Sequence, residues 1–326
     1  MSGLIIAGLC SLALTFLSGL VFIPVLRKVK AGQPILKYVK EHEQKSGTPT
    51  MGGLFFILPL AAVFFIFGGG RTRVATVSVD IGLFYMLVGF LDDFLKIKLK
   101  HNEGLKPYQK IVFQTAIALL GGAFAYTNGL TALYIPFVKR TADIGVFIIF
   151  VVAAVFIALT NSVNLTDGLD GLCGGVSACY LLTVAALIAL ERNFGAAYLK
   201  STEYDGVLLL ISVTFFAVIG FLIFNVPKAK VFMGDTGSLG LGGILGAASV
   251  FSGNTLFIPL IGAAFVWSSL SVIIQVAHFK RTRKRVFLMA PFHHHLQMKG
   301  LIETQIGFYY SLITVIIGLC SVIFYL

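Results

Sequence analysis

Charged residues are scarce in this chain, and acidic residues are the scarcest. Asp and Glu number 14 in 326 residues, and all charged residues together make up 12%. Hydrophobic residues make up 57%, and the mean hydropathy of +0.93 lies outside the range of soluble globular proteins. This composition excludes a soluble protein and predicts a membrane protein, in which every acid is costly and is expected to have a task.

Cysteine is also rare. The four cysteines stand in or beside apolar runs, without the spacing of a metal site: Cys10, Cys173, Cys179 and Cys320. We expect them to be small buried hydrophobic residues, and we expect no disulfide.

Long apolar runs are abundant. Backbone that crosses a bilayer must satisfy its own hydrogen bonds, so such runs predict helices. We predict an all-α integral membrane protein of about ten transmembrane helices, forming one polytopic domain over residues 1–326. The third and eighth runs are the weakest. The ten runs begin near Leu4, Met51, Val74, Ile111, Ile144, Leu172, Val207, Ser238, Leu256 and Ile306.

Lys and Arg are distributed unevenly between the loops. With alternating helices, 19 of the 25 basic residues fall in one set of loops and 6 in the other. Basic loops stay in the cytoplasm, so we predict that both termini lie outside. The net charge of +11 is then concentrated at the inner membrane face, where anionic lipid or substrate would be attracted. The bilayer is an expected partner, and a nucleic acid is not.

Adjacent acids occur in FLDDFLK, where Asp92 and Asp93 stand at the predicted inner end of the third run. Two neighbouring carboxylates repel each other, unless a cation holds them or one of them has a raised pKa suited to accepting a proton. The alternative is a pair of solvated acids that end a helix beside Lys96.

A second pair of acids, Asp167 and Asp170, stands in NLTDGLDGL, in a predicted inner loop that has no basic residue. If a helix begins here, both acids share one face near its positive N-terminal end. Asp167 as a helix cap, and the glycines as packing residues, are the alternatives. Neither accounts for Asn161 and Asn164, which we predict to bind substrate with the two acids.

A lone acid, Asp235, stands in the glycine-rich segment VFMGDTGSLGLGG, which we expect to open the eighth helix. Such a turn offers backbone N–H groups to phosphate, and its acid is a ligand suited to Mg²⁺. A capping Asp with packing glycines is the alternative. Nearby Asn225 and Phe232 are candidates to hydrogen-bond to a base and to stack on it.

Two further inner loops carry candidate substrate contacts. Lys45, in KSGTPTMGG, is a candidate for phosphate binding or a plain positive-inside anchor. His293, His294 and His295 are consecutive and cannot all face one metal, so we favour contacts with phosphate or sugar oxygens. All of these motifs fall in inner loops, which predicts a metal-assisted site at the cytoplasmic face.

Taken together, FLDDFLK, NLTDGLDGL, VFMGDTGS and PFHHH resemble the phospho-N-acetylmuramoyl-pentapeptide transferases of the polyprenyl-phosphate N-acetylhexosamine-1-phosphate transferase superfamily. The resemblance covers essentially the whole chain. It implies transfer from UDP-N-acetylmuramoyl-pentapeptide to undecaprenyl phosphate, giving lipid I and UMP for peptidoglycan, with Mg²⁺ as cofactor.

By position, the resemblance implies that Asp235 and Asp93 hold Mg²⁺ and that Asp92 and Asp93 sit at the reacting phosphates. It places the nucleotide and diphosphate among Lys45, Asp167, Asp170, Asn225 and Phe232, lines the site with Gln275, and brings the three histidines to the donor. Leu296, Gln297 and Leu301 depart from residues common in the family, which bears on the donor contacts.

Several alternatives stay open at this point. We favour direct attack by the lipid phosphate, with Asp92 as its base and Asp93 in support, over a two-step route through a covalent aspartyl intermediate. A related transferase using another UDP-N-acetylhexosamine, and a transporter, are the competing functions. The sequence does not distinguish a monomer from a homodimer.

Overall fold

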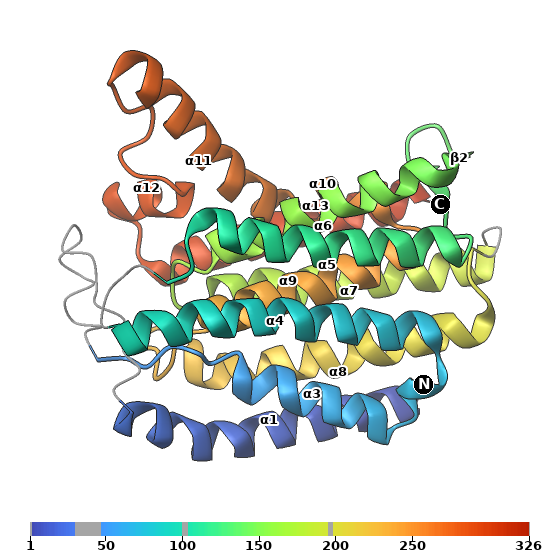
Figure 1. Ribbon diagram of the computed structural model, residues 1–326, viewed down its shortest axis with the longest axis horizontal. Coiled ribbons are helices and arrows are strands. Elements are labelled where there is room, and N and C mark those ends of the chain that lie inside the picture. Colours follow the sequence, from blue (N-terminus) through green and yellow to red (C-terminus); the bar gives the residue numbers. More distant parts are fainter. Residues whose placement is uncertain (1, 30–46, 100–103, 195–197, 326) are drawn as a thin grey trace.

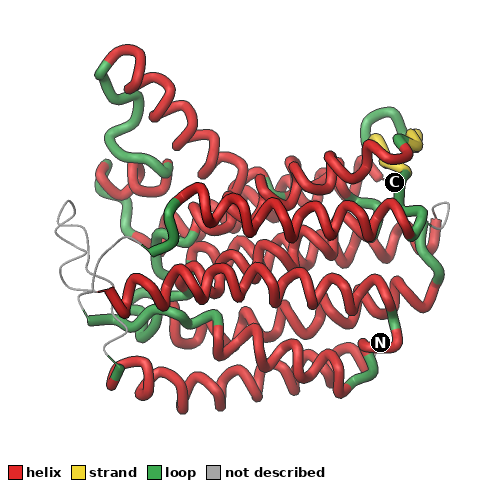
Figure 2. Tube along the Cα trace, in the orientation of Figure 1, coloured by secondary structure: helices red, strands yellow, loops and turns green. Residues whose placement is uncertain are grey.

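The structure is a computed structural model that describes residues 2–29, 47–99, 104–194 and 198–325. Helices account for most of it, joined by loops and one pair of strands (Figure 2). The long helices are α1 (Ser2–Lys28), α3 (Leu54–Ile66), α4 (Arg73–Leu99), α5 (Pro107–Thr127), α6 (Ile148–Thr166), α7 (Leu172–Phe194), α8 (Ser201–Asn225), α9 (Gly234–Phe251), α11 (Ala263–Thr282) and α13 (Glu303–Tyr325).

The predicted all-α membrane class is confirmed. Within the described residues, eight helices are long and apolar enough to cross a bilayer: α1, α4, α5, α6 (counted from Gly145), α7, α8, α11 and α13. Helix α3 has only 13 residues. The third run, expected to be weak, forms the 27-residue helix α4. The count of ten spans and the side on which the termini lie stay predictions, although Figure 1 places both termini at the same end of the bundle.

Short elements connect the long helices. They include two strands, β1 (Ala132–Ile135) and β2 (Arg140–Asp143), which pair antiparallel with Ala132 opposite Asp143 and which the sequence did not lead us to expect. Figure 1 shows this hairpin at the end of the bundle where the termini lie. The others are η1 (Gly69–Arg71), η2 (Gly145–Phe147), η3 (Thr255–Phe257), α10 (Ile258–Ile261) and α12 (Phe292–Met298).

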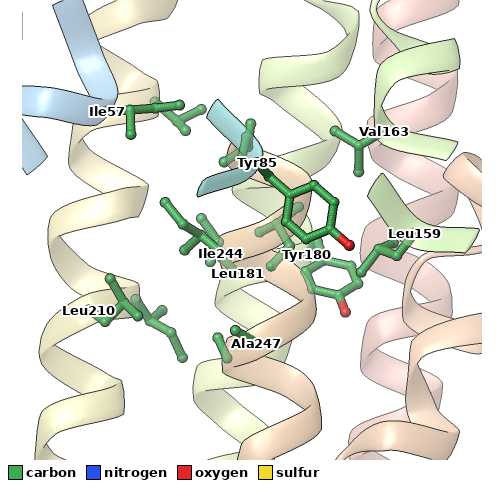
Figure 3. Close-up of a cluster of buried hydrophobic side chains, with 14 of the residues drawn as sticks. Ile57, Tyr85, Leu159, Val163, Tyr180, Leu181, Leu210, Ile244 and Ala247 are labelled. Carbon is green, nitrogen blue, oxygen red and sulfur yellow. The ribbon is translucent and has the colours of Figure 1, made fainter. Parts of the chain in front are cut away.

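Helix α9 runs through the centre of the bundle, and every residue from Thr236 to Phe251 is buried. Apolar side chains from α3, α4, α6, α7 and α8 surround it (Figure 3). Two of the buried tyrosines beside it satisfy their hydroxyl groups: Tyr180 shares a hydrogen bond with Ser249 at 2.7 Å, and Tyr85 donates to the Gln114 carbonyl at 3.1 Å. The core is therefore built around a helix that has no exposed face over this length.

Two glycines set how closely helices approach at one end of α9. A Cβ at Gly89 of α4 would collide with the Asp235 carbonyl, and a Cβ at Gly53 would collide with the backbone of Gly237. Glycine alone permits these backbone contacts. They fix the end of α4 and the turn before α3 against the first turn of α9, where the acidic residues lie.

Our expectation of buried cysteines was only partly correct. All four are free, and Cys173 is buried, but Cys10 and Cys320 are exposed. These two lie on α1 and α13, the first and last long helices, whose outward faces are not covered by protein. In a bilayer those faces contact acyl chains, so an apolar run does not require a buried side chain.

Candidate functional site: an acidic cluster between two helices

Three aspartates converge where the end of α4 meets the start of α9. Asp92 and Asp93 lie in the last two turns of α4, and Asp235 lies in the first turn of α9. Each offers a carboxylate oxygen, and these oxygens lie within 4.8 Å of one another. The sequence therefore predicted correctly that these acids, 142 positions apart between Asp93 and Asp235, occupy one site.

Asp92 is held by the loop that follows α4 and by its own helix. Its Oδ1 accepts a hydrogen bond from the Leu105 backbone N–H at 2.8 Å, and its Oδ2 pairs with Lys96 Nζ at 2.6 Å. Its exposed fraction is 3%. The alternative of two solvated acids is therefore wrong. The part of it that placed Lys96 beside the acids is right, because Lys96 forms an ion pair with Asp92.

Asp93 is fully buried and is held by the first turn of α9. Its Oδ2 accepts from the Thr236 backbone N–H at 2.9 Å and from Thr236 Oγ1 at 2.7 Å. Among the described residues its Oδ1 has no hydrogen-bond partner and lies 4.0 Å from Lys96 Nζ. A buried carboxylate oxygen without a partner is costly, which suits an atom that binds a cation or a substrate group.

Asp235 joins four elements. Its Oδ2 pairs with Lys96 at 3.1 Å and with Lys110 of α5 at 2.8 Å, while its Oδ1 accepts from the Asn164 amide of α6 at 2.7 Å. No hydrogen bond from its side chain caps α9, whose N-cap is Met233. The helix-cap alternative for Asp235 is therefore wrong.

Sequence reasoning missed the two lysines that neutralise this cluster. Lys96 stands three and four residues after Asp93 and Asp92, the spacing at which side chains meet on one helix face. That signal was present in FLDDFLK. Lys110 was counted only as a basic residue of the predicted inner loop and gave no local signal, because only the packing of α5 beside α4 brings it to Asp235.

The residues present fit a divalent cation such as Mg²⁺. Mg²⁺ prefers carboxylate oxygens, usually only one or two from the protein, together with substrate phosphates. The three close carboxylates and the unpartnered Asp93 Oδ1 offer such ligands. In this structure the ammonium groups of Lys96 and Lys110 neutralise the carboxylates that a cation would neutralise. Binding of a cation therefore requires these two side chains to move away from Asp235.

The two acids of NLTDGLDGL would share a helical face only if a helix began before them, and that condition is not met. Helix α6 ends at Thr166 and α7 begins at Leu172, so Asp167 and Asp170 lie in the turn between them rather than on one helical face. The chain turns here because Gly171 adopts a positive φ of 75°, which glycine tolerates. Asp167 is the C-cap of α6, not an N-cap.

The polar residues of this segment have different partners. Asn164 reaches the cluster, bonding Asp235 and also Ser238 Oγ at 2.8 Å. Asn161, one turn earlier, pairs instead with the Gln114 amide at 2.8 Å. Asp170 accepts from the Ala229 N–H at 3.0 Å.

The pKa of Asp167 is affected by the acidic cluster. Burial, and after it the negative charges of Asp235 and Asp93, hold the pKa of the Asp167 carboxyl well above its usual range, although a hydrogen bond from the Gly234 N–H opposes the shift. This acid therefore retains a proton more readily than a solvated aspartate. Its predicted place beside a bound diphosphate stays a prediction.

Asn225 and Phe232 bracket the loop between α8 and α9. The Asn225 amide donates to the Val231 carbonyl at 2.9 Å and accepts from the Gly171 N–H at 3.0 Å, so it ties this loop to the NLTDGLDGL turn. The Phe232 N–H donates to the Pro49 carbonyl at 2.8 Å, which docks the segment before α3. Lys45 lies outside the described residues, and its role stays a prediction.

The three histidines lie on the short helix α12 and face different surroundings. The His293 and His294 rings are 4.4 Å apart and cover Gly168, where a Cβ would collide with His293 Nε2. His295 instead accepts from the Leu288 N–H through Nδ1 at 3.1 Å. The expectation that the three do not face one point is confirmed.

His293 is the most unusual of the three. It is fully buried, and neither ring nitrogen has a hydrogen-bond partner among the described residues. Burial, and then the neighbouring His294, hold its pKa well below the usual value, so the ring is neutral near pH 7. Two unpartnered ring nitrogens beside the NLTDGLDGL turn leave a donor and an acceptor for a ligand.

Gln275 on α11 serves the loop that carries the histidines. Its Oε1 accepts from the Val286 and Phe287 N–H groups at 3.0 and 2.9 Å, and its Nε2 donates to the Phe287 carbonyl at 3.1 Å. In this structure it braces that loop against α11. A direct contact with substrate stays a prediction.

The chain matches known families over the elements that build this cluster. Residues 75–253 match the profile of Glycosyl transferase family 4, and residues 45–57 match the phospho-N-acetylmuramoyl-pentapeptide-transferase signature 1. The phospho-N-acetylmuramoyl-pentapeptide-transferase of Clostridioides difficile (strain 630) is 42% identical over 97% of this chain and 95% of its own. The chain belongs to the phospho-N-acetylmuramoyl-pentapeptide-transferase family.

Other members of the transferase family are similarly close. The relative of that name from Thermoanaerobacter sp. (strain X514) is 40% identical over 96% of each chain, and the one from Clostridium botulinum (strain Alaska E43 / Type E3) is 39% identical over 95% of this chain and 92% of its own. The family-4 match runs from α4 into the turn after α9 and so contains all three cluster aspartates. The transferase signature covers Lys45 and the segment docked by Phe232.

Proposed function

We propose that this protein transfers phospho-N-acetylmuramoyl-pentapeptide from its UDP donor to undecaprenyl phosphate, giving lipid I and UMP for peptidoglycan synthesis. The observation that carries the proposal is the convergence of Asp92, Asp93 and Asp235 in a membrane protein of this family. Phosphoryl transfer depends mainly on positioning and charge stabilisation, and paired carboxylates and lysines at a membrane boundary can provide both.

Asp93 and Asp235 are the proposed Mg²⁺ ligands. When bound, the ion neutralises the diphosphate and stabilises the departing UMP. Thr236 fixes one oxygen of Asp93 and leaves the other free to bind, while Asn164 holds Oδ1 of Asp235. Lys96 and Lys110, released from Asp235, are placed to contact phosphate oxygens instead.

Asp92 is the proposed base for the lipid phosphate. Its Oδ1 is oriented by the Leu105 N–H, and its Oδ2 by Lys96, so a proton taken from the acceptor stays within an existing hydrogen-bond network. The phosphate oxygen then attacks the β-phosphorus of the donor, and the bond to UMP breaks. We favour this one-step route over attack by an aspartate itself.

The surrounding residues are the proposed binding site for the donor. Asp167 and Asp170 lie in the turn covered by His293 and His294, so nucleotide, diphosphate and sugar groups would lie between the α6–α7 turn and α12. His293 is positioned to hydrogen-bond to the donor through its unpartnered nitrogens. The excess of Lys and Arg in loops at this end supports a cytoplasmic location of the site.

The test is UMP release by the purified protein, with each of UDP-N-acetylmuramoyl-pentapeptide, undecaprenyl phosphate and Mg²⁺ omitted in turn. We expect release only when all three are present and expect Asp235→Asn to abolish it. Asp205→Asn is the matched control, because Asp205 is exposed and pairs with Arg192, away from the cluster.

Other outcomes would replace the proposal. Equal release from a different UDP-N-acetylhexosamine would indicate a related transferase, and a phospho-enzyme trapped without lipid acceptor would indicate the two-step route. Uptake of a labelled solute by proteoliposomes, without lipid turnover, would indicate a transporter.

A further inference from the structure

Helix α11 leaves the bundle, in contrast to the other long helices (Figure 1). Its buried residues all stand in its first half, and every residue from Val276 to Val286 is exposed. Several exposed side chains on it are large and apolar: Trp267, Leu270, Ile273, Ile274, Val276 and Phe279. In a bilayer, these exposed apolar side chains contact acyl chains, because the rest of the protein does not cover them.

A dense group of cations ends this helix. We call the five basic residues of KRTRKR the basic cap: Lys280, Arg281, Arg283, Lys284 and Arg285. No Asp or Glu occurs in the sequence between Asp235 and Glu303. Across residues 2–29, 47–99, 104–194 and 198–325, none of the five forms an ion pair with a carboxylate, whereas Lys96, Lys110 and Arg192 all do.

The basic cap is an ordered turn and not a loose tail. Arg283 adopts a left-handed conformation with φ of 59° and ends the helix, Thr282 Oγ1 accepts from the Lys284 N–H at 3.2 Å, and Arg285 Nη1 donates to the Leu288 carbonyl at 3.1 Å. Phe279 on one side and Val286 on the other are exposed. Cations flanked by apolar side chains are suited to a membrane surface, where the apolar groups enter acyl chains and the cations meet phosphates.

The basic cap is also connected to the histidines. Gln275 braces Val286 and Phe287 against α11, and Ser271 Oγ accepts from the Phe292 N–H at 3.0 Å. The position of α11 is thereby linked to α12, which covers Gly168 with His293. A ligand that fixes the basic cap would therefore also fix the orientation of α12.

We propose that the basic cap binds the headgroups of anionic phospholipids in the leaflet at the site end of the bundle, in preference to zwitterionic ones, and so holds α11 and α12 in place. Two observations carry this inference: no Asp or Glu stands between Asp235 and Glu303 in the sequence, and none of the five cations forms an ion pair within the described part of the chain. It goes beyond the proposed transferase activity and does not depend on it. Each cation near an anionic membrane surface contributes about fivefold in binding, so three contribute roughly 100-fold.

Trp267 provides a direct readout, because it is the single Trp of the chain, lies on α11 and is 40% exposed. A lipid whose headgroup sits on the basic cap extends its acyl chains along the helix toward this residue. Detergent-solubilised protein is titrated with phosphatidylglycerol or with phosphatidylcholine, each brominated on its acyl chains, and quenching of Trp267 fluorescence is followed. We expect quenching by the anionic lipid at a much lower concentration, with the difference shrinking at high salt.

The test variant is Lys280→Gln/Arg281→Gln/Lys284→Gln, which keeps the left-handed turn of Arg283 and the hydrogen bond of Arg285. We expect it to require roughly 100-fold more anionic lipid for half-maximal quenching. The matched control is Lys139→Gln/Arg140→Gln, which neutralises exposed cations of the hairpin at the opposite end and should quench like the parent.

Three results would overturn the proposal: equal quenching of the parent by both lipids, unchanged lipid selectivity in the test variant, or loss of quenching on adding undecaprenyl phosphate in equimolar amount to the protein. The last result would assign the basic cap to the substrate lipid instead. Because quenching requires no turnover, these outcomes are separate from success or failure of the UMP assay.

Discussion

The acidic cluster and the histidine helix α12 lie at the same end of the molecule and are built in opposite ways. In the cluster, Asp92, Asp93 and Asp235 are compensated by lysines, an amide and backbone N–H groups from several elements. On α12, His293 is fully buried and both of its ring nitrogens lack a partner among the described residues.

This difference indicates how each region would respond to substrate. Buried carboxylates without counterions would be prohibitively costly, so the protein supplies lysines that a cation can later replace. Burying a neutral imidazole without hydrogen bonds costs less free energy than burying an unpaired charge. His293 can therefore lack partners until a ligand binds. The cluster is therefore expected to exchange partners on binding, whereas the histidine is expected to gain them.

The largest effect should come from removing a metal ligand. Asp93→Asn keeps the shape of the side chain but removes the charge that would hold Mg²⁺, and we expect UMP release to fall by about 10³-fold, the equivalent of several kcal/mol of charge stabilisation. Activity of Asp93→Asn within tenfold of the parent would show that Asp93 is not a metal ligand needed for the reaction. Asp205→Asn serves again as the control.

A smaller loss of activity should come from the histidine. His293→Phe keeps a ring beside Tyr310 but removes both nitrogens, and we expect kcat/KM for the UDP donor to fall by roughly 10- to 100-fold, as for a lost hydrogen bond to a charged group. His295→Phe is the comparison, because its Nδ1 is already used by the Leu288 N–H. Equal effects of the two variants would show that the unpartnered nitrogens of His293 have no special part in binding the donor.

Replacing a lysine should test whether it acts as a counterion. Lys110→Met leaves Asp235 with less compensation, and we expect the free energy of unfolding without Mg²⁺ to fall by about 1–2 kcal/mol, because Lys110 is partly exposed. Added Mg²⁺ should raise the melting temperature of the variant more than that of the parent. The counterion role would be refuted if Mg²⁺ stabilised both equally.

The smallest effect concerns pH. The folded state holds the pKa of His293 well below its unfolded value of about 6.5, so below that pH the unfolded chain takes up a proton that the folded chain does not. Stability should therefore fall as the pH drops from 6.5, by at most about 1.4 kcal/mol per pH unit from this group. His293→Phe should flatten this slope in melting curves between pH 5.5 and 7.5, and an unchanged slope would show that His293 is protonated in the folded protein.

By itself, the sequence determined the membrane class and the gathering of the acidic motifs. Apolar runs of bilayer length force the chain to cross back and forth, so segments such as FLDDFLK and GDTGS, at alternate run ends, must meet at one end of the bundle. The tertiary structure alone decided which side chains touch. Lys110 reaches Asp235, Asn161 turns to Gln114, and Asp167 and Asp170 fall in a turn, because these partners depend on helix rotation and on glycine contacts such as Gly89 against Asp235. The sequence also did not predict that α11 extends away from the bundle, because an apolar run has the same composition whether protein or lipid covers it.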